Sequence, residues 1–257
     1  MNSKDLVRDE FYFLETALAR FGAIVTIDQF ASLYRGKRNY LRRRLSTICE
    51  KGWLYRIRRG LYIISDLATR GTLAISQYAV VSLLSEEAYV SFENALHYHN
   101  LFDQLQNQII SIATQQRASS QIAGFTYHFI KAKQEFFYGW ESHIIDNIDV
   151  KIATREKALI DLIQFHRNRY AVDLVLEKLT DLRGELDIKI FTNLILRSNV
   201  ATQRVMGFLF DLARIDSNIL QDELKHKHGT SRITASNKNL YSSKWNLYYD
   251  DYFTKYA

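Results

Sequence analysis

The feature that most constrains this chain is a basic stretch from Arg35 to Arg59, which reads RGKRNYLRRRLSTICEKGWLYRIRR. Ten of its 25 residues are Lys or Arg and Glu50 is its single acidic residue, so its net charge is +9. The whole chain carries +6, which leaves the rest of the sequence slightly acidic at −3. One concentrated positive element on a mildly acidic body is typical of a protein that binds nucleic acid.

An apolar stripe within this stretch predicts a helix with one polar face. Leu41, Leu45 and Ile48 follow the i, i+4, i+7 spacing of a single helix face, so this side is expected to pack on a core. The opposite side carries residue types that form paired hydrogen bonds with base edges or grip phosphates. The outward and flanking residues are Asn39, Arg42, Arg43, Ser46, Thr47 and Glu50.

A basic hairpin is predicted directly after this helix. Gly52 is a natural helix stop. Apolar and basic residues then alternate over residues 55–58, as in a half-exposed strand, and a second apolar run covers residues 61–64. Gly60 relieves the turn between them, which makes the pair a candidate wing. The alternative interpretation is a solvated basic helix beside an unrelated hairpin.

The preceding residues complete the pattern of a winged helix-turn-helix. An apolar repeat over residues 11–21 predicts a first helix, and residues 23–25 can form a short strand. Thr26 and Gln29 fit a capping box that opens a second helix. Helix, strand, helix, tight turn, helix and hairpin over about residues 5–65 predict a winged helix-turn-helix whose third helix enters the major groove.

Eleven side chains of the basic stretch are therefore candidates for contacts with double-stranded DNA. Lys and Arg neutralise phosphates, whereas Arg, Asn, Ser and Thr can also read base edges. The candidates are Arg35, Lys37, Arg38, Asn39, Arg42, Arg43, Ser46, Thr47, Arg56, Arg58 and Arg59.

Length and composition set the remaining limits. At 257 residues, with 47% hydrophobic residues, the chain can form one large or two modest domains with a packed core. Cys49, the single cysteine, excludes an internal disulfide, and its place beside the apolar stripe favours a structural thiol over a reactive one. The N-terminal ten residues are too charged for a signal peptide, and the longest uncharged run, residues 71–85, is too short and polar to cross a bilayer. We expect a cytoplasmic protein with no membrane partner.

Residue patterns predict an α+β fold class with two domains. Residues 66–71 turn polar, so we expect a winged helix-turn-helix domain over residues 1–68 and a second domain over residues 69–257. The second domain is expected to be mixed α/β over 69–165 and mainly helical over 166–257. Strands are predicted at 88–91, 108–114, 125–131, 135–140 and 150–153, and helices at 75–84, 92–99, 172–182, 188–196, 201–215 and 219–227.

The C-terminal tail from residue 238 to residue 257 is rich in aromatic residues. Trp245, Tyr248, Tyr252 and Tyr256 would share one face if this segment were helical. Two interpretations remain open: a terminal segment docked on its own core, or an exposed aromatic surface for a protein partner.

The middle of the chain carries a resemblance to a known family. Its longest element is the run from Val150 to Leu162, VKIATREKALIDL, in which EKALIDL follows a predicted strand. Shorter elements are Val90-Ser91, Ala95-Leu96, the strand 109–113, Gly139 and the hairpin sequence Arg59-Gly60-Leu61-Tyr62. Together they resemble the AbiEi family, the antitoxins of abortive-infection (type IV) toxin–antitoxin systems, over about residues 10–165.

This resemblance implies two roles. The winged helix would repress the operon that encodes the protein and its toxin. Independently of the resemblance, one winged helix reads only a few base pairs, so we expect inverted repeats in the promoter, bound by two copies as a dimer or as monomers side by side. The remainder would counteract a nucleotidyltransferase-like toxin. The family often has Gly where this chain has Asn100, before Leu101, but Asn tolerates a left-handed backbone nearly as well, so we expect the turn to persist. A Pro common just after that element is missing, since the chain has no proline.

The sequence offers no recognisable catalytic or metal-binding constellation, so we expect no enzymatic activity, no cofactor and no metal. His97 and His99 are two apart, on different sides of a helix, with no nearby Cys or carboxylate. Glu156 and Asp161 are five apart and also on different faces; Glu156 fits a helix dipole at a first turn. P-loop, GxSxG, HExxH and CxxC motifs do not occur. Residues 225–228, KHKH, are interpreted as a solvated helix end or an auxiliary phosphate contact.

The leading hypothesis is thus a DNA-binding autorepressor and antitoxin. The alternative is a winged-helix transcriptional regulator whose second domain senses a small ligand and which has no toxin partner. A nucleotidyltransferase gene immediately downstream would favour the antitoxin.

Overall fold

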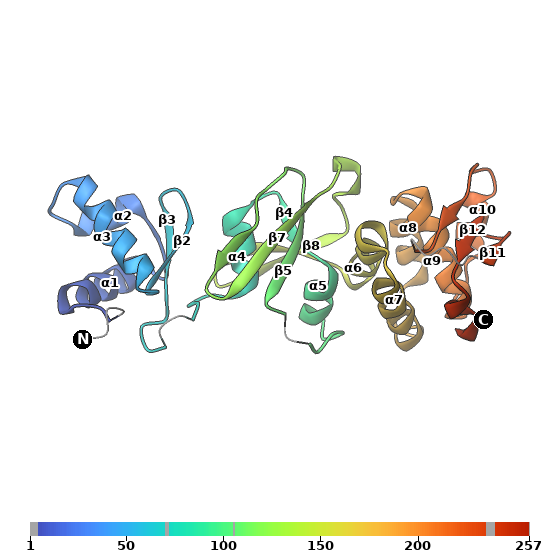
Figure 1. Ribbon diagram of the computed structural model, residues 1–257, viewed down its shortest axis with the longest axis horizontal. Helices are drawn as coiled ribbons and strands as arrows, with labels where there is room; N and C mark the ends of the chain where they lie inside the picture. Colours follow the sequence, from blue (N-terminus) through green and yellow to red (C-terminus); the bar gives the residue numbers. More distant parts are fainter. Residues whose placement is uncertain (1–4, 70–71, 105, 235–239, 257) are drawn as a thin grey trace. The chain divides into compact units, whose positions relative to one another are not determined.

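The computed structural model describes residues 5–69, 72–104, 106–234 and 240–256 and shows a mixed α+β protein, as predicted (Figure 1). The chain divides into two compact units. Unit 1 comprises Met1–Tyr89, Gln106–Lys131 and Ser142–Lys151, and unit 2 comprises Val90–Leu105, Ala132–Glu141 and Ile152–Ala257. The predicted boundaries after residues 68 and 165 divide the chain differently and stay a prediction; residues 70 and 71 of the polar segment lie outside the described residues.

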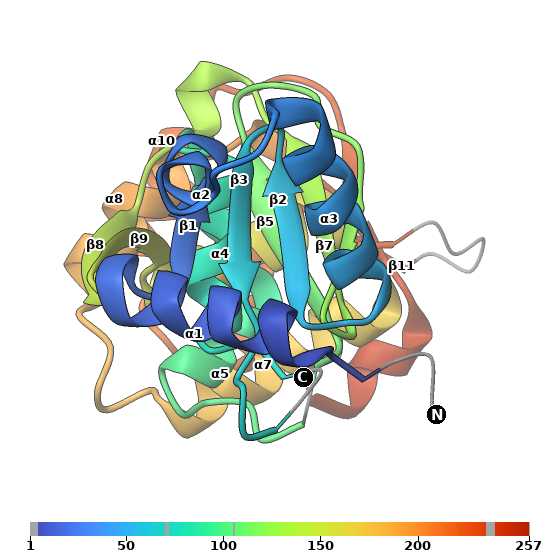
Figure 2. The same cartoon turned by 90° about the vertical axis from the view of Figure 1, so that its left-hand side faces the viewer.

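The N-terminal part of unit 1 follows the predicted order of elements. Its bounds are α1 (Arg8–Phe21), β1 (Ile24–Thr26), α2 (Ile27–Leu33), α3 (Arg38–Glu50), β2 (Leu54–Arg58) and β3 (Leu61–Ile64). The strands form a sheet in the order β1-β3-β2, with β3 antiparallel to both neighbours. In Figure 2, α1 crosses in front of the strands and α3 lies beside β2.

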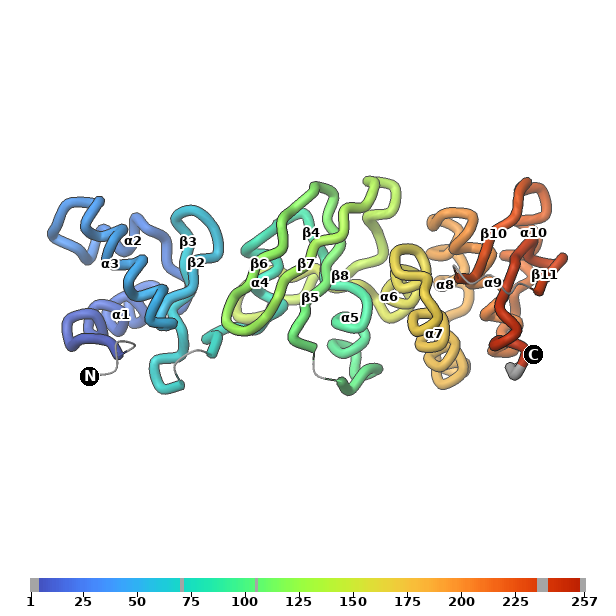
Figure 3. Tube along the Cα trace, in the orientation of Figure 1, coloured from blue at the N-terminus to red at the C-terminus, as the bar shows by residue number. Residues whose placement is uncertain are grey.

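Local sequence signals explain where these elements begin and turn. The Gln29 backbone N–H donates to Thr26 Oγ1 (3.2 Å) and the Thr26 backbone N–H donates to Gln29 Oε1 (2.7 Å), so the predicted capping box is confirmed. The chain turns from β2 into β3 at Gly60, whose φ of 80° favours glycine (Figure 3). A register shift between Arg56 and Arg58 places a bulge just before this turn.

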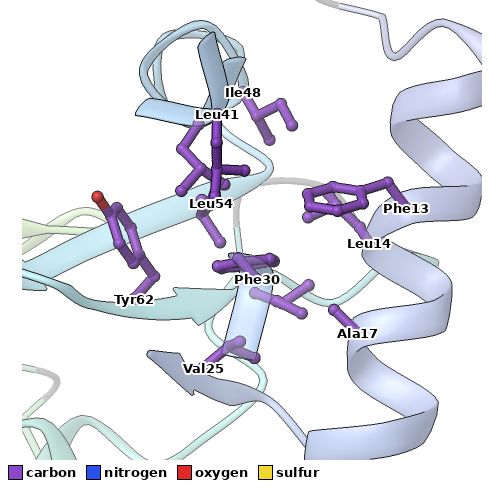
Figure 4. Close-up of a cluster of buried hydrophobic side chains, with 11 residues drawn as sticks. Phe13, Leu14, Ala17, Val25, Phe30, Leu41, Ile48, Leu54 and Tyr62 are labelled. Atoms are coloured by element: carbon purple, nitrogen blue, oxygen red, sulfur yellow. The ribbon is translucent and has the colours of Figure 1, made fainter. Parts of the chain in front are cut away.

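The core of this part holds α3 in place. The predicted stripe of Leu41, Leu45 and Ile48 is fully buried. Phe30 of α2 lies between the side chains of α1 and those of the sheet (Figure 4). The apolar repeat predicted over residues 11–21 is confirmed for buried Leu14 and for half-buried Leu18 and Phe21, which pack against this core, whereas Phe11 is 40% exposed.

The later segments of unit 1 supply most of a second sheet. The elements here are α4 (Gln77–Leu84), β4 (Ala88–Val90), β5 (Gln108–Ala113), β6 (Ser120–Ile122), β7 (Phe125–Lys131), β8 (Trp140–Ile145) and β9 (Ile148–Ala153). The strand order is β6-β7-β5-β4-β9-β8, and the division between the two units passes along β4, β8 and β9. β5 and β7 are parallel neighbours, and β6 is antiparallel to β7.

The predicted strand over residues 135–140 is wrong. Residues Gln134–Phe136 form a 3-10 turn, and the strand begins only at Trp140. Gly139 has a φ of 73°, which breaks an extended run at that point.

Unit 2 is built mainly from helices. Their bounds are α5 (Phe92–Tyr98), α6 (Arg155–Asp161), a π-helical turn η2 (Leu162–His166), α7 (Arg169–Asp181), α8 (Ile188–Leu196), α9 (Val200–Leu212) and α10 (Asn218–Leu224). Val90 of β4 pairs in parallel with Ile152 of β9. Thr154 then caps α6, because its Oγ1 accepts a hydrogen bond from the Lys157 backbone N–H (3.2 Å).

The turn after α5 forms with Asn at its left-handed position. Asn100 has a φ of 59°, in the left-handed region. The Asn100 N–H donates to the His97 carbonyl (3.0 Å) and the Leu101 N–H to the Leu96 carbonyl (2.8 Å). These two bonds are those of a Schellman motif, so the expectation that Asn preserves this turn is confirmed.

A fully buried ion pair lies on α6. The side chains of Lys157 and Asp161 are 0% exposed, and Lys157 Nζ donates to Asp161 Oδ1. Ser91 Oγ donates to the other carboxylate oxygen at 2.7 Å, and Lys157 Nζ lies 4.5 Å from the centre of the Tyr138 ring. Burial lowers the pKa of Lys157, and the Asp161 carboxylate opposes that shift. A Cβ at Gly139 would lie 3.0 Å from Lys157, so the glycine makes room for this side chain.

The described part of the C-terminal tail is not an α-helix, so the shared aromatic face that a helix would give does not form. Residues 240–256 contain β11 (Leu240–Ser242), β12 (Leu247–Tyr249) and a 3-10 segment (Asp251–Tyr256), and β12 also pairs with β10 (Ser231–Arg232). Trp245 is 1% exposed against Gly207 of α9, and its Nε1 donates to Asp211 Oδ2 (2.7 Å). For Trp245, the interpretation that the tail docks on the chain's own core is therefore confirmed. The side chain of Tyr256 and residues 238, 239 and 257 lie outside the described residues.

Candidate nucleic-acid interface

All eleven predicted DNA-contact side chains are exposed. Two of them, Arg35 and Lys37, lie in the turn that leads into α3. The α3 members are Arg38, Asn39, Arg42, Arg43, Ser46 and Thr47, and the hairpin members are Arg56, Arg58 and Arg59. The fold therefore brings two separate sequence segments, one helical and one extended, onto neighbouring elements, since α3 packs beside β2.

A hollow of about 650 Å³ lies between α3 and the hairpin, and we call it the basic hollow. Its lining residues are Ile27, Arg38, Arg42, Ser46, Cys49, Arg56, Arg59, Gly60 and Tyr62. Four of these nine are arginines and none is acidic. Five of the predicted side chains thus converge on one concave surface, which suits an anionic group.

The exposed side chains of α3 fall on two faces. At 100° per residue, Arg38, Arg42 and Ser46 follow one another at intervals of four on the side toward the hairpin, and these residues line the basic hollow. Asn39 and Arg43 lie farther round, opposite the buried stripe. The helix therefore presents an outward face and a hairpin-facing side, a distinction that the sequence prediction had not made.

Two cations of the basic stretch serve the fold instead of the surface. Lys51 Nζ donates to Glu10 Oε2 at 2.6 Å, and both side chains are mostly buried, at 16% and 11% exposure. Arg44 stacks over the Phe13 ring, 4.9 Å from its centre, and donates to the Asp9 carbonyl (2.8 Å). Both contacts tie α3 to α1, so these residues orient the helix that carries the candidate site.

Two of the exposed arginines have carboxylate neighbours. Arg38 lies 2.7 Å from Asp28, and Arg58 lies 3.7 Å from Glu86. All four side chains are more than half exposed, at 52% to 81%, so these pairs are weak and can exchange for another anion. Among the described residues, no ion pair involves Arg42, Arg56 or Arg59.

The floor of the basic hollow contains protonated groups. Burial raises the pKa of Cys49 to about 11, and the nearby Arg56 only partly opposes this shift. Burial also raises the pKa of Tyr62, while Arg56 and Arg42 act to lower it. Both arginines therefore act electrostatically on the same floor residue. The half-buried Cys49 thiol stays protonated near neutral pH, in keeping with the predicted structural role.

Sequence reasoning missed Tyr40 as a candidate contact. This side chain is 59% exposed on α3, next to Asn39. Its ring is an apolar group that could contact a base or sugar. The signal was available, since Tyr40 falls outside the apolar stripe of Leu41, Leu45 and Ile48.

The other sequence candidates have local structural partners. His97 Nδ1 lies 2.8 Å from the Phe102 carbonyl oxygen, and His99 Nε2 lies 2.8 Å from the Ala153 carbonyl oxygen. Residues 225–228 are exposed, and buried Arg204 donates to the carbonyls of Lys227 (2.8 Å) and His228 (3.1 Å). Within the described ranges, no cluster of three or more His, Cys, Asp or Glu residues is arranged to hold a metal ion. None of the helices in the same ranges is long and apolar enough to span a bilayer.

Comparison with known proteins gives a fold likeness and no family. No family model matches the chain, and no curated protein matches it. Its structure is similar to the crystal structure of the RV2827C protein from Mycobacterium tuberculosis, with a TM-score of 0.63 and 15% sequence identity. The match covers 95% of this chain and 92% of that chain. At this identity the likeness concerns the fold alone.

Proposed function

We propose that this protein is a DNA-binding transcriptional regulator that uses a winged helix-turn-helix formed by residues 8–64. The supporting observation is the basic hollow, where arginines of α3 and of the β2–β3 hairpin meet without an acidic lining residue. The helix α3 is the reading element, and the hairpin is the wing. The anchoring of α3 through Arg44 and Lys51 supports this proposal, because a reading helix must be held rigidly.

The proposed role in the cell is that of an autorepressor and antitoxin. It rests on the sequence resemblance to the AbiEi family, whose longest element forms β9, the Thr154 cap and α6. In this role the DNA-binding part represses the protein's own operon, and the remaining chain counteracts a nucleotidyltransferase-like toxin in the cytoplasm.

A ligand-sensing regulator without a toxin partner is the second candidate. One observation favours it: a hollow of about 690 Å³ in unit 2 between the segment 101–104 and α7. Its lining combines apolar Phe102 and Leu174 with charged Arg169 and Asp173, a mixture that suits a small polar ligand.

Binding of the full-length protein to the promoter of its own gene tests the DNA-binding proposal. If about six phosphates are contacted, the slope of log K against log salt is roughly −5 per DNA-binding part. Footprinting is expected to show inverted repeats whose half-sites lie about 10 base pairs, or a multiple, apart. A salt-independent interaction, or a single isolated half-site, would contradict the proposal.

Separation of repression from protection tests the antitoxin role. A variant with Arg42, Arg43, Arg58 and Arg59 replaced by Ala is expected to fold, because all four side chains are exposed. It should lose promoter binding yet still rescue growth when co-expressed with the product of the adjacent gene. If this variant is soluble and folded but fails to protect cells, neutralisation depends on DNA binding, and the plain regulator is favoured.

A further inference from the structure

The lining of the basic hollow has the composition of an anion-binding site, and it belongs to the surface that we propose binds DNA. Arg42 enters it from α3, while Arg56 and Arg59 enter it from the hairpin. Each guanidinium offers several N–H donors in a planar fork that matches the oxygens of a phosphate. Ser46 adds a hydroxyl to the same lining. Among the described residues, these three arginines have no carboxylate ion-pair partner, so their charge is not neutralised within the chain.

The shape of duplex DNA identifies which anion reaches this position. A helix in the major groove lies next to a sugar–phosphate backbone, and that backbone separates the major groove from the neighbouring minor groove. A hairpin beside the helix must therefore lie across the same backbone strand. The space between the two elements is the space that this strand would occupy.

We propose that the basic hollow is a seat for one strand of the DNA backbone, in which Arg42, Arg56 and Arg59 hold the same phosphate segment. The inference rests on the proposed DNA-binding function and deepens it. It divides the exposed residues of α3 into two groups with different tasks. The hairpin-facing side grips phosphates regardless of sequence, whereas Asn39 and Arg43 on the outward face read bases.

The surrounding charges are compatible with this seat. Two lining residues on α3 contact a carboxylate: Arg38 pairs with Asp28, and Ser46 Oγ lies 3.5 Å from Glu50 Oε1. The Arg38–Asp28 pair is exposed on both sides, so a phosphate can replace Asp28 as the partner of Arg38. The apolar and protonated floor, Ile27, Cys49 and Tyr62, adds no negative charge.

Single substitutions in the full-length protein provide the first test. Arg42→Ala and Arg59→Ala are each expected to weaken binding to promoter and random-sequence duplexes by the same factor, with the salt slope less negative by about 0.9. Arg43→Ala, the matched control on the outward face of α3, is expected to weaken promoter binding more than random binding. If Arg42→Ala reduces the preference for promoter over random DNA as much as Arg43→Ala does, Arg42 reads bases and the proposed backbone seat is wrong.

Duplexes with one phosphate replaced by an uncharged methylphosphonate provide the second test. At one position of the footprinted half-site, this replacement is expected to weaken wild-type binding. On that duplex, neither Arg42→Ala nor Arg59→Ala should cause a further loss, because the charge that both hold is already gone. If no single position, or pair of adjacent positions, silences both substitutions, the two arginines do not share a phosphate segment and the proposal fails.

These outcomes also distinguish this proposal from the function on which it rests. Promoter binding that is intact and salt-dependent, with no shared phosphate position, overturns the seat and leaves the DNA-binding function standing. Absence of any duplex binding overturns both. A third experiment measures binding of inorganic pyrophosphate to the full-length protein. If the wild type binds it with a submillimolar Kd, and Arg42→Ala abolishes this binding without changing duplex affinity, the hollow binds a free phosphate compound. That result would overturn the backbone seat.

Discussion

The arginines of the basic hollow and the Lys157–Asp161 pair use positive charge in opposite ways. Arg42, Arg56 and Arg59 are exposed and, among the described residues, form no ion pair. Lys157 is fully buried, and its ammonium group contacts both Asp161 and the Tyr138 ring. An exposed guanidinium keeps its hydration until a partner arrives, whereas a buried ammonium depends on a partner within the fold. Charge of the first kind is available for binding, and charge of the second kind holds the structure together.

The largest expected effect is at Lys157. Lys157→Met removes one member of the buried pair and leaves the Asp161 carboxylate buried without its cation. We expect the free energy of unfolding to fall by about 3–5 kcal/mol. Urea denaturation of the full-length protein measures this loss.

A double replacement sharpens that result. Lys157→Met combined with Asp161→Leu removes both charges, so much of the lost stability should return, because an apolar pair often replaces a buried ion pair without penalty. If the double variant is as unstable as Lys157→Met alone, the charge imbalance is not the cause. Arg42→Ala is the exposed control, with an expected change within about 0.5 kcal/mol.

Lys51 lies between the two extremes and should show an intermediate effect. Its ammonium group contacts Glu10 at 2.6 Å, and both side chains retain slight exposure. Lys51→Met should therefore cost about 1.5–3 kcal/mol of unfolding free energy, the usual range for a hydrogen bond to a charged group. Promoter affinity should fall only together with stability, since this cation orients α3 and does not line the hollow. A loss of affinity without a loss of stability would move Lys51 into the binding group.

The outward face of α3 should affect discrimination and not stability. Asn39→Ala and Arg43→Ala are each expected to reduce the preference for promoter over random DNA by about 1–3 kcal/mol, the range for a lost bidentate base contact. Competition binding with random duplex measures this preference. Equal losses on both DNAs would show that these side chains contact phosphates.

The smallest effect concerns the Cys49 thiol on the floor of the hollow. Burial raises its pKa from the ordinary thiol value of 9.0 to about 11, so the folded state favours the protonated thiol. The resulting stability is present below pH 9 and is lost as pH rises toward 11, because the unfolded chain releases this proton first. At pH 8, alkylation by iodoacetamide should be roughly 100-fold slower in the folded protein than in urea, since the thiolate is the reactive form. Rapid alkylation of the folded protein would contradict this burial.

Features set by neighbouring residues could be predicted from the sequence, and features set by distant residues could not. The capping box of Thr26 and Gln29 and the buried stripe of α3 depend on spacings of three or four residues, and both are present. The i, i+4 spacing of Lys157 and Asp161 was visible as well, but spacing alone cannot separate a buried pair from an exposed one.

The tail shows the limit most directly. Its aromatic spacing is compatible with a helix, but Trp245 is buried where Gly207 of α9 leaves space for the indole ring. That packing determines the tail, and no local pattern encodes it. At the candidate site, residue types and exposure could be predicted, whereas the division of α3 into two sides depends on the position of the hairpin.

The parallel pairing of Val90 with Ile152 has a consequence for synthesis on the ribosome. The core around α1–α3 and β1–β3 has all its buried members once Ile64 has left the exit tunnel. β4 gains its neighbour β5 early, but its other neighbour, β9, is paired through Ile152, 62 residues after Val90, which is roughly 3–12 s at ordinary translation rates. During that interval the nascent chain carries a complete N-terminal core ahead of an unfinished sheet. Translation of a transcript cleaved between the codons for residues 90 and 152 would thus yield fragments that retain the candidate DNA-binding surface but lack most of unit 2.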